Sequence, residues 1–212
     1  MKDMIVCLSG GLDSSSLLFD FKDRVRLAVS FKYPSNHNDK ELECAKHVVS
    51  IVGVEHKIVD LTHAFEGFRS ALLDGADSVP DYSKESISQL VVPFRNGIFL
   101  SILAGLAESF DCKYVALANH LRHLMACPDC KLEFCEAMAK AIEYGTSNNV
   151  QLFYPYALIT KGEIVYRGIR AGMDPNWTYS CYRGEDVECG VCAACLQKKE
   201  ALQYAYSKVK GV

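Results

Sequence analysis

The sequence predicts an α/β fold, a Rossmann-like, doubly wound parallel sheet followed by a small C-terminal four-cysteine appendage. Short apolar runs alternate with segments of helical periodicity along most of the 212 residues, and parallel strands require such crossover helices. The cysteines give the second observation, because four of the ten lie between positions 181 and 195. We expect an α/β domain over residues 1–176 and a cysteine-rich segment with a helix over 177–212, with one continuous domain as the alternative.

Apolar periodicity places the individual elements. Five strands are expected where short runs are rich in apolar or β-branched residues: 4–8, 26–31, 54–61, 113–118 and 152–156. Five helices are expected where apolar residues recur at helical spacing: 14–21, 40–52, 98–110, 131–144 and 196–208. Gly53 ends the second of these helices. A polar stretch over 75–85, with Pro80 and no steady period, predicts a loop over the site.

Composition limits the function. The formal net charge is -3 and the isoelectric point is near 6.1, without the basic surplus that is typical of duplex-binding proteins. A small-molecule substrate is therefore expected. No positively charged start precedes a long apolar run, and no stretch approaches the roughly 20 apolar residues that span a bilayer. We expect a cytoplasmic protein without membrane contact.

The strongest motif is S-G-G-L-D-S-S-S at Ser9–Ser16, between the first expected strand and the first expected helix. Glycines let the backbone approach an anion, helix-start amides point at it, and serine hydroxyls add donors. The string lacks the Gly-Lys-Ser/Thr ending of the Walker loop and the dinucleotide G-x-G-x-x-G pattern. It predicts a phosphate site, and the alternative is an ordinary Gly-Gly turn before a serine-capped helix.

The cysteines near the C-terminus form a C-x7-C-x2-C-x2-C pattern: Cys181, Cys189, Cys192 and Cys195. Four thiolates close a tetrahedral shell, which predicts a structural zinc site, with an iron–sulfur cluster and unligated cysteines as alternatives. Cys127 and Cys130 form a second C-x2-C with no matching pair nearby other than Cys135. The alternative there is a helix-entry turn that Asp129 caps.

Ser9–Ser16 resembles the PP-loop of the ATP pyrophosphatases, which have an adenine nucleotide alpha-hydrolase-like fold. Four further segments extend the resemblance to the 7-cyano-7-deazaguanine (preQ0) synthase family, which serves queuosine biosynthesis. These are V-P-F-R-N-G-I-F-L-S at 92–101, P-D-C at 128–130, S-C-Y at 180–182, and Lys161 with Glu163. The resemblance implies an ATP-dependent carbon–nitrogen ligase that adenylates 7-carboxy-7-deazaguanine and converts it with ammonia, through an amide, to the nitrile, releasing AMP and pyrophosphate. It also implies Mg²⁺, a resident Zn²⁺ and a homodimer.

The resemblance also implies roles for particular residues. Asp13, Arg95 and Lys161 would be catalytic. The nucleotide would contact Leu8, Ser9, Gly10, Gly11, Leu12, Asp13, Ser14, Ser15, Ser16, Arg95 and Asn96. The substrate would contact Tyr33, His37, Asp129 and His123, with the Asp129 carboxylate accepting the N–H donors of the guanine-like edge.

The substrate side departs from the family pattern. His123 replaces an aspartate, Cys127 a tyrosine and Lys131 an arginine, and Ser35-Asn36 stands where the family has Gln-Arg. The departures leave an alternative in which the activated carboxylate is transferred to another amine, on a protein or nucleic acid in antiviral defence. A PP-loop tRNA-modifying enzyme and a non-catalytic nucleotide sensor are further alternatives.

Overall fold

The computed structural model describes residues 2–83, 85–120 and 127–211. Its centre is a five-stranded, entirely parallel sheet in the order β3-β2-β1-β4-β5. The strands are β1 (Met4–Cys7), β2 (Val25–Lys32), β3 (Glu55–Asp60), β4 (Tyr114–Ala116) and β5 (Gln151–Phe153). The predicted α/β fold is confirmed. Because the order reverses between β1 and β4, the carboxyl ends of these two strands form the switch point at which such sheets bind ligands.

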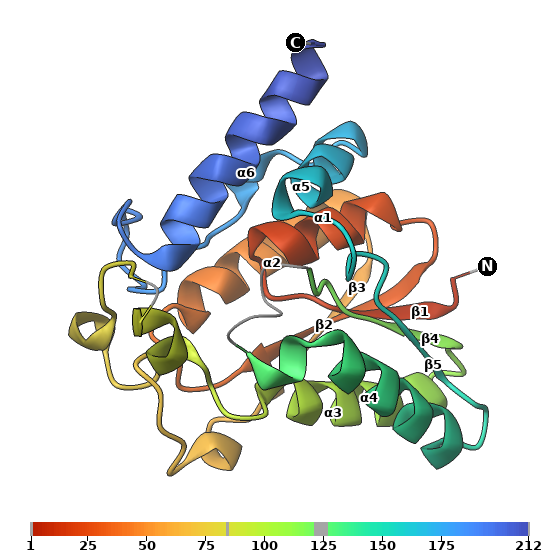
Figure 1. Cartoon of the computed structure of the whole chain (residues 1–212). Coiled ribbons are helices and arrows are strands. Elements are labelled where there is room, and N and C mark those ends of the chain that lie inside the picture. Colours follow the sequence, from red (N-terminus) through yellow and green to blue (C-terminus); the bar gives the residue numbers. More distant parts are fainter. Residues whose placement is uncertain (1, 84, 121–126, 212) are drawn as a thin grey trace.

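Helices cover both faces of the sheet (Figure 1). One face carries α1 (Leu12–Asp20), α2 (Asn38–Val52) and α5 (Lys161–Arg170), and the other carries α3 (Arg95–Ser109) and α4 (Leu132–Gly145). Each face has its own buried apolar cluster, one with α3 and α4 residues and one with α1, α2 and α5 residues. The helix α6 (Ala193–Lys210) packs on α5, and its C-terminal end projects from the body.

Sequence periodicity missed α5. A capping signal was available, because the Thr160 hydroxyl accepts a hydrogen bond from the backbone N–H of Glu163, at the start of a Thr-x-x-Glu pattern. Other helices begin earlier than predicted. For example, α3 begins at Arg95 instead of Ile98, and α6 begins at Ala193, immediately after a cysteine. Arg95, Asn96 and Gly97 delay the apolar period at the start of α3. The first turn of α6 consists of two alanines and Cys195, which the sequence analysis assigned to the cysteine cluster.

The stretch 75–85 contains the 3-10 turn η2 (Ala76–Ser78) and packs on the cysteine-rich segment. Asp81 pairs with Arg183 at 2.6 Å, and the Tyr82 N–H donates to the Val191 carbonyl at 3.2 Å. These contacts hold the loop against the cysteine-rich segment, beside the predicted site.

The stretch Ser86–Ser109 is long and apolar enough to cross a membrane by length and composition. In the structure it is split between the 3-10 turn η3 (Glu85–Leu90) and α3, and 44% of its most apolar window is buried inside the protein. Many of the apolar side chains in this stretch are therefore part of the buried core.

Candidate functional site

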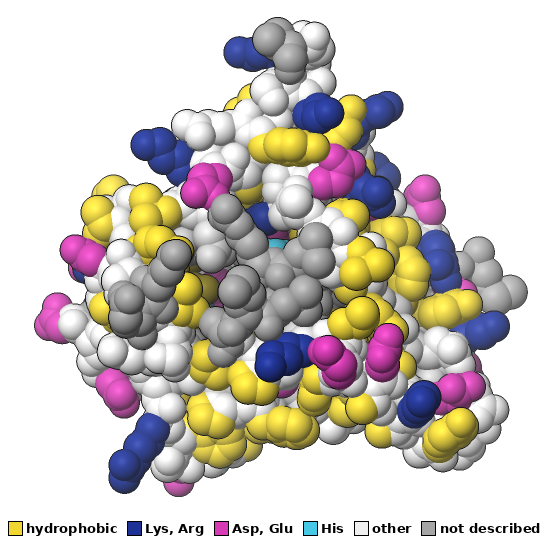
Figure 2. All heavy atoms as spheres, in the orientation of Figure 1, with side chains coloured by type: hydrophobic (Ala, Val, Ile, Leu, Met, Phe, Trp, Pro, Cys, Tyr) yellow, Lys and Arg dark blue, Asp and Glu magenta, His cyan; other side chains and the backbone are white. Residues whose placement is uncertain are grey.

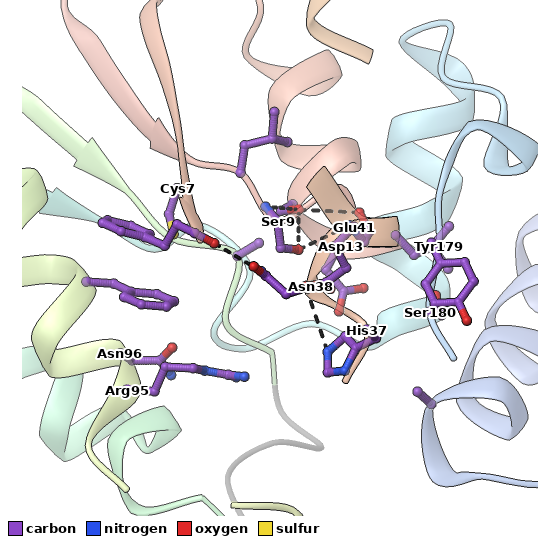
Figure 3. Close-up of a pocket in the computed structure, with 18 of the residues that line it drawn as sticks. Cys7, Ser9, Asp13, His37, Asn38, Glu41, Arg95, Asn96, Tyr179 and Ser180 are labelled. Atoms are coloured by element: carbon purple, nitrogen blue, oxygen red, sulfur yellow. Dashed lines mark hydrogen bonds and ion pairs between the residues drawn. The ribbon is translucent and has the colours of Figure 1, made fainter. Parts of the chain in front are cut away.

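A cavity opens at the carboxyl ends of β1 and β4, at the switch point of the sheet. Its walls include Cys7 and Leu8 after β1 and residues 117–119 after β4. The cavity has a volume of about 180 Å³ and is open to solvent on one side. Ser9, Asp13, His37, Glu41, Arg95 and Tyr179 surround it in Figure 3. The topology thus brings distant segments to one site.

The Ser9–Ser16 loop forms one wall. Gly10 adopts φ 86°, and a Cβ there would collide with the Glu41 carbonyl oxygen, so the loop requires glycine. Gly11 is the N-cap of α1, and its N–H donates to Ser9 Oγ at 3.1 Å. The first amides of α1 lack carbonyl partners within the helix, which suits an anion at this end. The buried Ser15 Oγ has no hydrogen-bond partner among the described residues.

Asp13 joins this loop to α5. Lys161 Nζ lies 2.7 Å from Asp13 Oδ2, and His120 Nε2 lies 3.4 Å from the same oxygen. Burial alone would raise the pKa of Asp13, but the charge of Lys161 and the contact with His120 hold it well below its usual range. Within the described residues, the buried Asp13 Oδ1 has no hydrogen-bond partner. A charged carboxylate with a free oxygen beside a phosphate loop fits a magnesium ligand.

The opposite wall is the start of α3. Arg95 Nη1 donates to the Tyr33 hydroxyl at 3.0 Å, so the guanidinium is held at the cavity and keeps further N–H donors for a ligand. Asn96 also lines the cavity, but its side-chain amide is already engaged. Its Nδ2 donates to the Asp129 carbonyl at 3.2 Å and to Cys130 Sγ at 3.3 Å. A phosphate or carboxylate in the cavity would therefore meet Arg95 first.

Two groups beside the loop have unusual acidity. Burial raises the pKa of Glu41 to about 8, although the charge of Arg95 opposes the shift. Burial, together with the charge of Arg95, lowers the pKa of His37 to about 3. His37 Nε2 lies 3.8 Å from Glu41 Oε2. Glu41 was missed in the sequence analysis, and the available signal was its position four residues after His37, the N-cap of α2.

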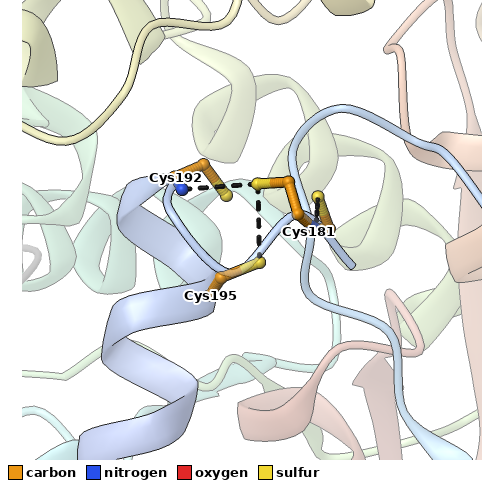
Figure 4. A group of neighbouring side chains, drawn as sticks. Cys181, Cys192 and Cys195 are labelled. Carbon is orange, nitrogen blue, oxygen red and sulfur yellow. Dashed lines mark hydrogen bonds between the residues drawn. The ribbon is translucent and has the colours of Figure 1, made fainter. Parts of the chain in front are cut away.

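The four predicted zinc ligands converge at the start of α6, with all ligand atoms within 4.8 Å of one another (Figure 4). Backbone N–H groups support the sulfurs: Cys192 N donates to Cys189 Sγ, and Cys189 N to Cys181 Sγ, both at 3.4 Å. A hydrogen bond from Cys195 lowers the pKa of the Cys192 thiol to about 5 despite burial. Four such sulfurs fit a closed tetrahedral metal shell.

This cysteine-rich segment also builds the cavity. The Tyr179 N–H donates to the Gly10 carbonyl at 3.2 Å, which ties the segment to the phosphate loop. The lining includes Tyr179, Ser180 and Tyr182 before the second cysteine ligand and Ala194 and Gln197 on α6. The four-cysteine cluster and the Ser9–Ser16 loop are therefore adjoining parts of one structure.

Most of the predicted site residues share the cavity: Leu8, Ser9, Gly11, Leu12, Asp13, Ser14, Tyr33, His37, Arg95, Asn96 and Lys161. Ser16 Oγ donates to the Leu12 carbonyl and packs against Gly168, away from this lining. Asp129 does not cap α4. Its Oδ2 instead accepts the Asn96 N–H at 2.7 Å, in the first turn of α3. His123 lies outside the described residues.

Charges on the surface do not separate by sign. On the face shown in Figure 2, Lys and Arg side chains are interspersed with Asp and Glu. This arrangement agrees with the net charge of -3 and with a small-molecule substrate.

Comparison with known proteins gives a consistent result. A solved structure of NMN synthetase from Francisella tularensis shares the fold, with a TM-score of 0.50 and 14% identity over 99% of this chain and 86% of that chain. Proteins named 7-cyano-7-deazaguanine synthase from Porphyromonas gingivalis and Desulfotalea psychrophila are each 41% identical over 96% of this chain, and over 94% and 95% of their own lengths. One from Methanoregula boonei is 36% identical over 95% of this chain and 94% of its own.

The family model described as queuosine biosynthesis protein QueC matches residues 3–206. This range includes the phosphate loop, the start of α3, the Asp13–Lys161 pair and all four clustered cysteines. From this match and the relatives named above, the chain belongs to the QueC family of queuosine biosynthesis proteins.

Proposed function

We propose that this protein is an ATP-dependent ligase that converts 7-carboxy-7-deazaguanine and ammonia into 7-cyano-7-deazaguanine, with release of AMP and pyrophosphate. The observation that carries the proposal is the cavity at the switch point, where the phosphate loop, the Asp13–Lys161 pair and Arg95 converge. Relatives that are named for this product match nearly the whole chain. AMP is a far better leaving group than a carboxylate oxygen, which is the chemical reason for using ATP.

In this proposal the loop amides and Ser9, Ser14 and Ser15 hold the pyrophosphate part of ATP. Asp13 Oδ1 would hold a Mg²⁺ ion, which would offset the negative charge of the phosphates, and this role fits its depressed pKa and its oxygen without a hydrogen-bond partner among the described residues. Lys161 keeps Asp13 oriented and adds positive charge near the phosphates as pyrophosphate leaves.

Arg95 binds the α-phosphate or the substrate carboxylate through paired N–H donors. Its contact with the Tyr33 hydroxyl fixes the direction of the guanidinium before a ligand arrives. This preorganisation lets the arginine stabilise the charge that develops as the carboxylate attacks phosphorus. Tyr33 and His37 line the same wall and would contact the deazaguanine ring.

Glu41 lines the cavity and would accept a proton from the nitrogen of the attacking ammonia. When ammonia attacks the activated acyl carbon, a C–N bond forms, the nitrogen gives up a proton, and AMP leaves with the electron pair, which gives the amide. A second ATP then adenylates the amide oxygen, which leaves with AMP as the nitrogen gives up its two remaining protons and the nitrile forms. A carboxylate with a pKa of about 8 accepts the proton from ammonia effectively near neutral pH.

The four-cysteine cluster is proposed to hold Zn²⁺ in a structural role, because a closed thiolate shell leaves no position for substrate. We also propose a cytoplasmic location and a homodimer. No disulfide joins the described cysteines, which suits a reducing compartment. Exposed apolar side chains on α6, including Tyr204 and Val209, offer a surface for a symmetric partner.

The test is mass spectrometry of the products after purified protein is incubated with 7-carboxy-7-deazaguanine, ATP, Mg²⁺ and ammonium. A nitrile with AMP and pyrophosphate is expected, and Lys161→Met serves as the inactive matched control. An amide that never becomes a nitrile would replace the proposal with transfer to another amine, for which the altered positions Cys127 and Lys131 are the motive. Absence of AMP with this acid would reject the substrate class.

A further inference from the structure

Three side chains outside the four-cysteine cluster come together in the turn that precedes α4. Cys127, Asp129 and Cys130 each offer a ligand atom, and these atoms lie within 4.8 Å of one another. Asp129 Oδ1 accepts from Cys127 Sγ at 2.8 Å and lies 4.0 Å from Cys130 Sγ. The 3-10 turn η5 (Pro128–Cys130) brings them together because it folds the chain back within three residues. One small ion would reach all three atoms with short side-chain adjustments.

A second layer of hydrogen bonds orients these groups. The Asn96 N–H donates to Asp129 Oδ2 at 2.7 Å, which leaves Oδ1 directed at the sulfurs. Asn96 Nδ2 donates to Cys130 Sγ at 3.3 Å. Asp129 and Cys130 are both about 3% exposed. Metal ligands in proteins are commonly fixed in this way by outer-shell donors.

The start of α3 favours a negative charge on Asp129. The group sits at the first turn of α3, where Asp129 accepts a backbone N–H, and immediately before α4, which begins at Leu132. Helix N-termini stabilise anions through their partial positive charge. Cys127 is a thiol in this arrangement, since its Sγ donates to Asp129 Oδ1. A divalent cation would take the place of the thiol protons between these three groups.

We propose that Cys127, Asp129 and Cys130 form a second metal site that binds Zn²⁺. Two soft sulfurs and one oxygen suit zinc better than Mg²⁺ or Ca²⁺. Binding releases the two thiol protons, and three protein ligands leave a fourth position for water or an added ligand. The site is separate from the four-cysteine cluster and does not depend on the identity of the reaction.

Metal binding at this turn would also affect the cavity, because the start of α3 contacts both. Asp129 holds the backbone of Asn96, and Asn96 and its neighbour Arg95 line the cavity. A metal ion at this turn would fix the first turn of α3 and with it the direction of the Arg95 guanidinium. Zinc at this site is therefore a positioning element for the cavity wall.

The test measures zinc per chain in the full-length protein, equilibrated with buffered zinc under reducing conditions. Wild type is expected to bind two equivalents, and Cys127→Ser one. Cys44→Ser is the matched control, since Cys44 is half-buried and belongs to neither group, and it should keep both. Asp129→Asn retains an acceptor for the Asn96 N–H, so it should stay folded and bind zinc at this site at least about tenfold more weakly.

Cobalt substitution gives an independent reading, because thiolate-to-cobalt charge-transfer absorption should fall in Cys127→Ser and not in Cys44→Ser. Either of two results would overturn the proposal. One is equal zinc content in wild type and Cys127→Ser, with melting curves showing both folded. Another is a wild-type mass lower by two hydrogens that Cys127→Ser abolishes, because that would identify a Cys127–Cys130 disulfide in place of a metal site.

Discussion

Lys161 Nζ lies 2.7 Å from Asp13 Oδ2, although the two residues are 148 positions apart. The contact joins the start of α5 to the loop after β1, across the mouth of the cavity. It gives the phosphate loop a fixed electrostatic partner before any nucleotide binds. The pair is therefore both a structural link and part of the proposed catalytic apparatus.

Removing one partner of this pair should cost stability as well as activity. Lys161→Met is expected to lower the free energy of unfolding by on the order of 2 kcal/mol, because Asp13 stays largely buried with only His120 beside it. The double variant Asp13→Asn/Lys161→Met should be less destabilised than the sum of the single variants. Urea unfolding of the four proteins measures this coupling. Strictly additive effects would mean that the contact has no energetic role.

Arg95 should be more sensitive to substitution than the residue that holds it. Arg95→Lys is expected to lower kcat/KM by at least about tenfold, because a lysine loses the paired N–H donors. Tyr33→Phe removes only the hydroxyl contact and should cost about fivefold, on the order of 1 kcal/mol, because the guanidinium keeps its charge and its other N–H donors. Steady-state rates with ATP and with the acid varied separately measure both. An equal loss in the two variants would show that Arg95 acts only through Tyr33.

Local patterns in the sequence predicted the strands of the sheet, the phosphate loop and the cysteine cluster, because each of these patterns lies within a short stretch of neighbouring residues. The remainder depends on long-range packing. Periodicity could not show that the Glu41 side chain is buried next to Ser9. Nor could it show that Asp129 accepts a hydrogen bond from α3 and does not cap α4. Two local signals marked α5, a Thr-x-x-Glu cap and a short amphipathic run, but two glycines and several charged residues interrupt the run.

The raised pKa of Glu41 predicts that the free energy of unfolding falls as the pH rises. A carboxyl whose pKa is about 8 in the folded protein and near 4.3 in the unfolded chain favours folding at low pH. That contribution is lost as pH rises from about 4.3 to about 8, at up to about 1.4 kcal/mol per pH unit. Glu41→Gln cannot ionise, so its stability relative to wild type should increase across that window.

Urea unfolding at several pH values between 5 and 9 measures this difference. Glu43→Gln is the control, since Glu43 is exposed on the same helix and should show no such trend. Glu41→Gln should also slow product formation with ammonia while leaving ATP binding intact, because the proton acceptor is gone. A flat stability difference between the two variants would contradict the raised pKa.

Loss of the four-cysteine metal shell should damage nucleotide binding. Cys195→Ser removes one ligand, so the melting temperature should fall and the KM for ATP should rise, since Tyr179 ties this segment to Gly10. Cys112→Ser, at a buried cysteine outside both clusters, should cost only about 1 kcal/mol and leave KM unchanged. Zinc content, thermal melting and KM separate the two variants. Normal ATP binding in a zinc-depleted Cys195→Ser protein would contradict the coupling.

The boundary proposed after residue 176 yields the last prediction. Ala201 and Ala205 of α6 are buried in the same apolar cluster as Ile164 and Val165 of α5. A chain that ends at residue 176 would expose that cluster and lose a wall of the cavity, so it should fail to unfold cooperatively. A chain that ends at residue 206 removes only exposed or undescribed positions and should melt close to wild type. Circular dichroism melting compares them, and cooperative, near-wild-type melting of the shorter chain would establish two independent units.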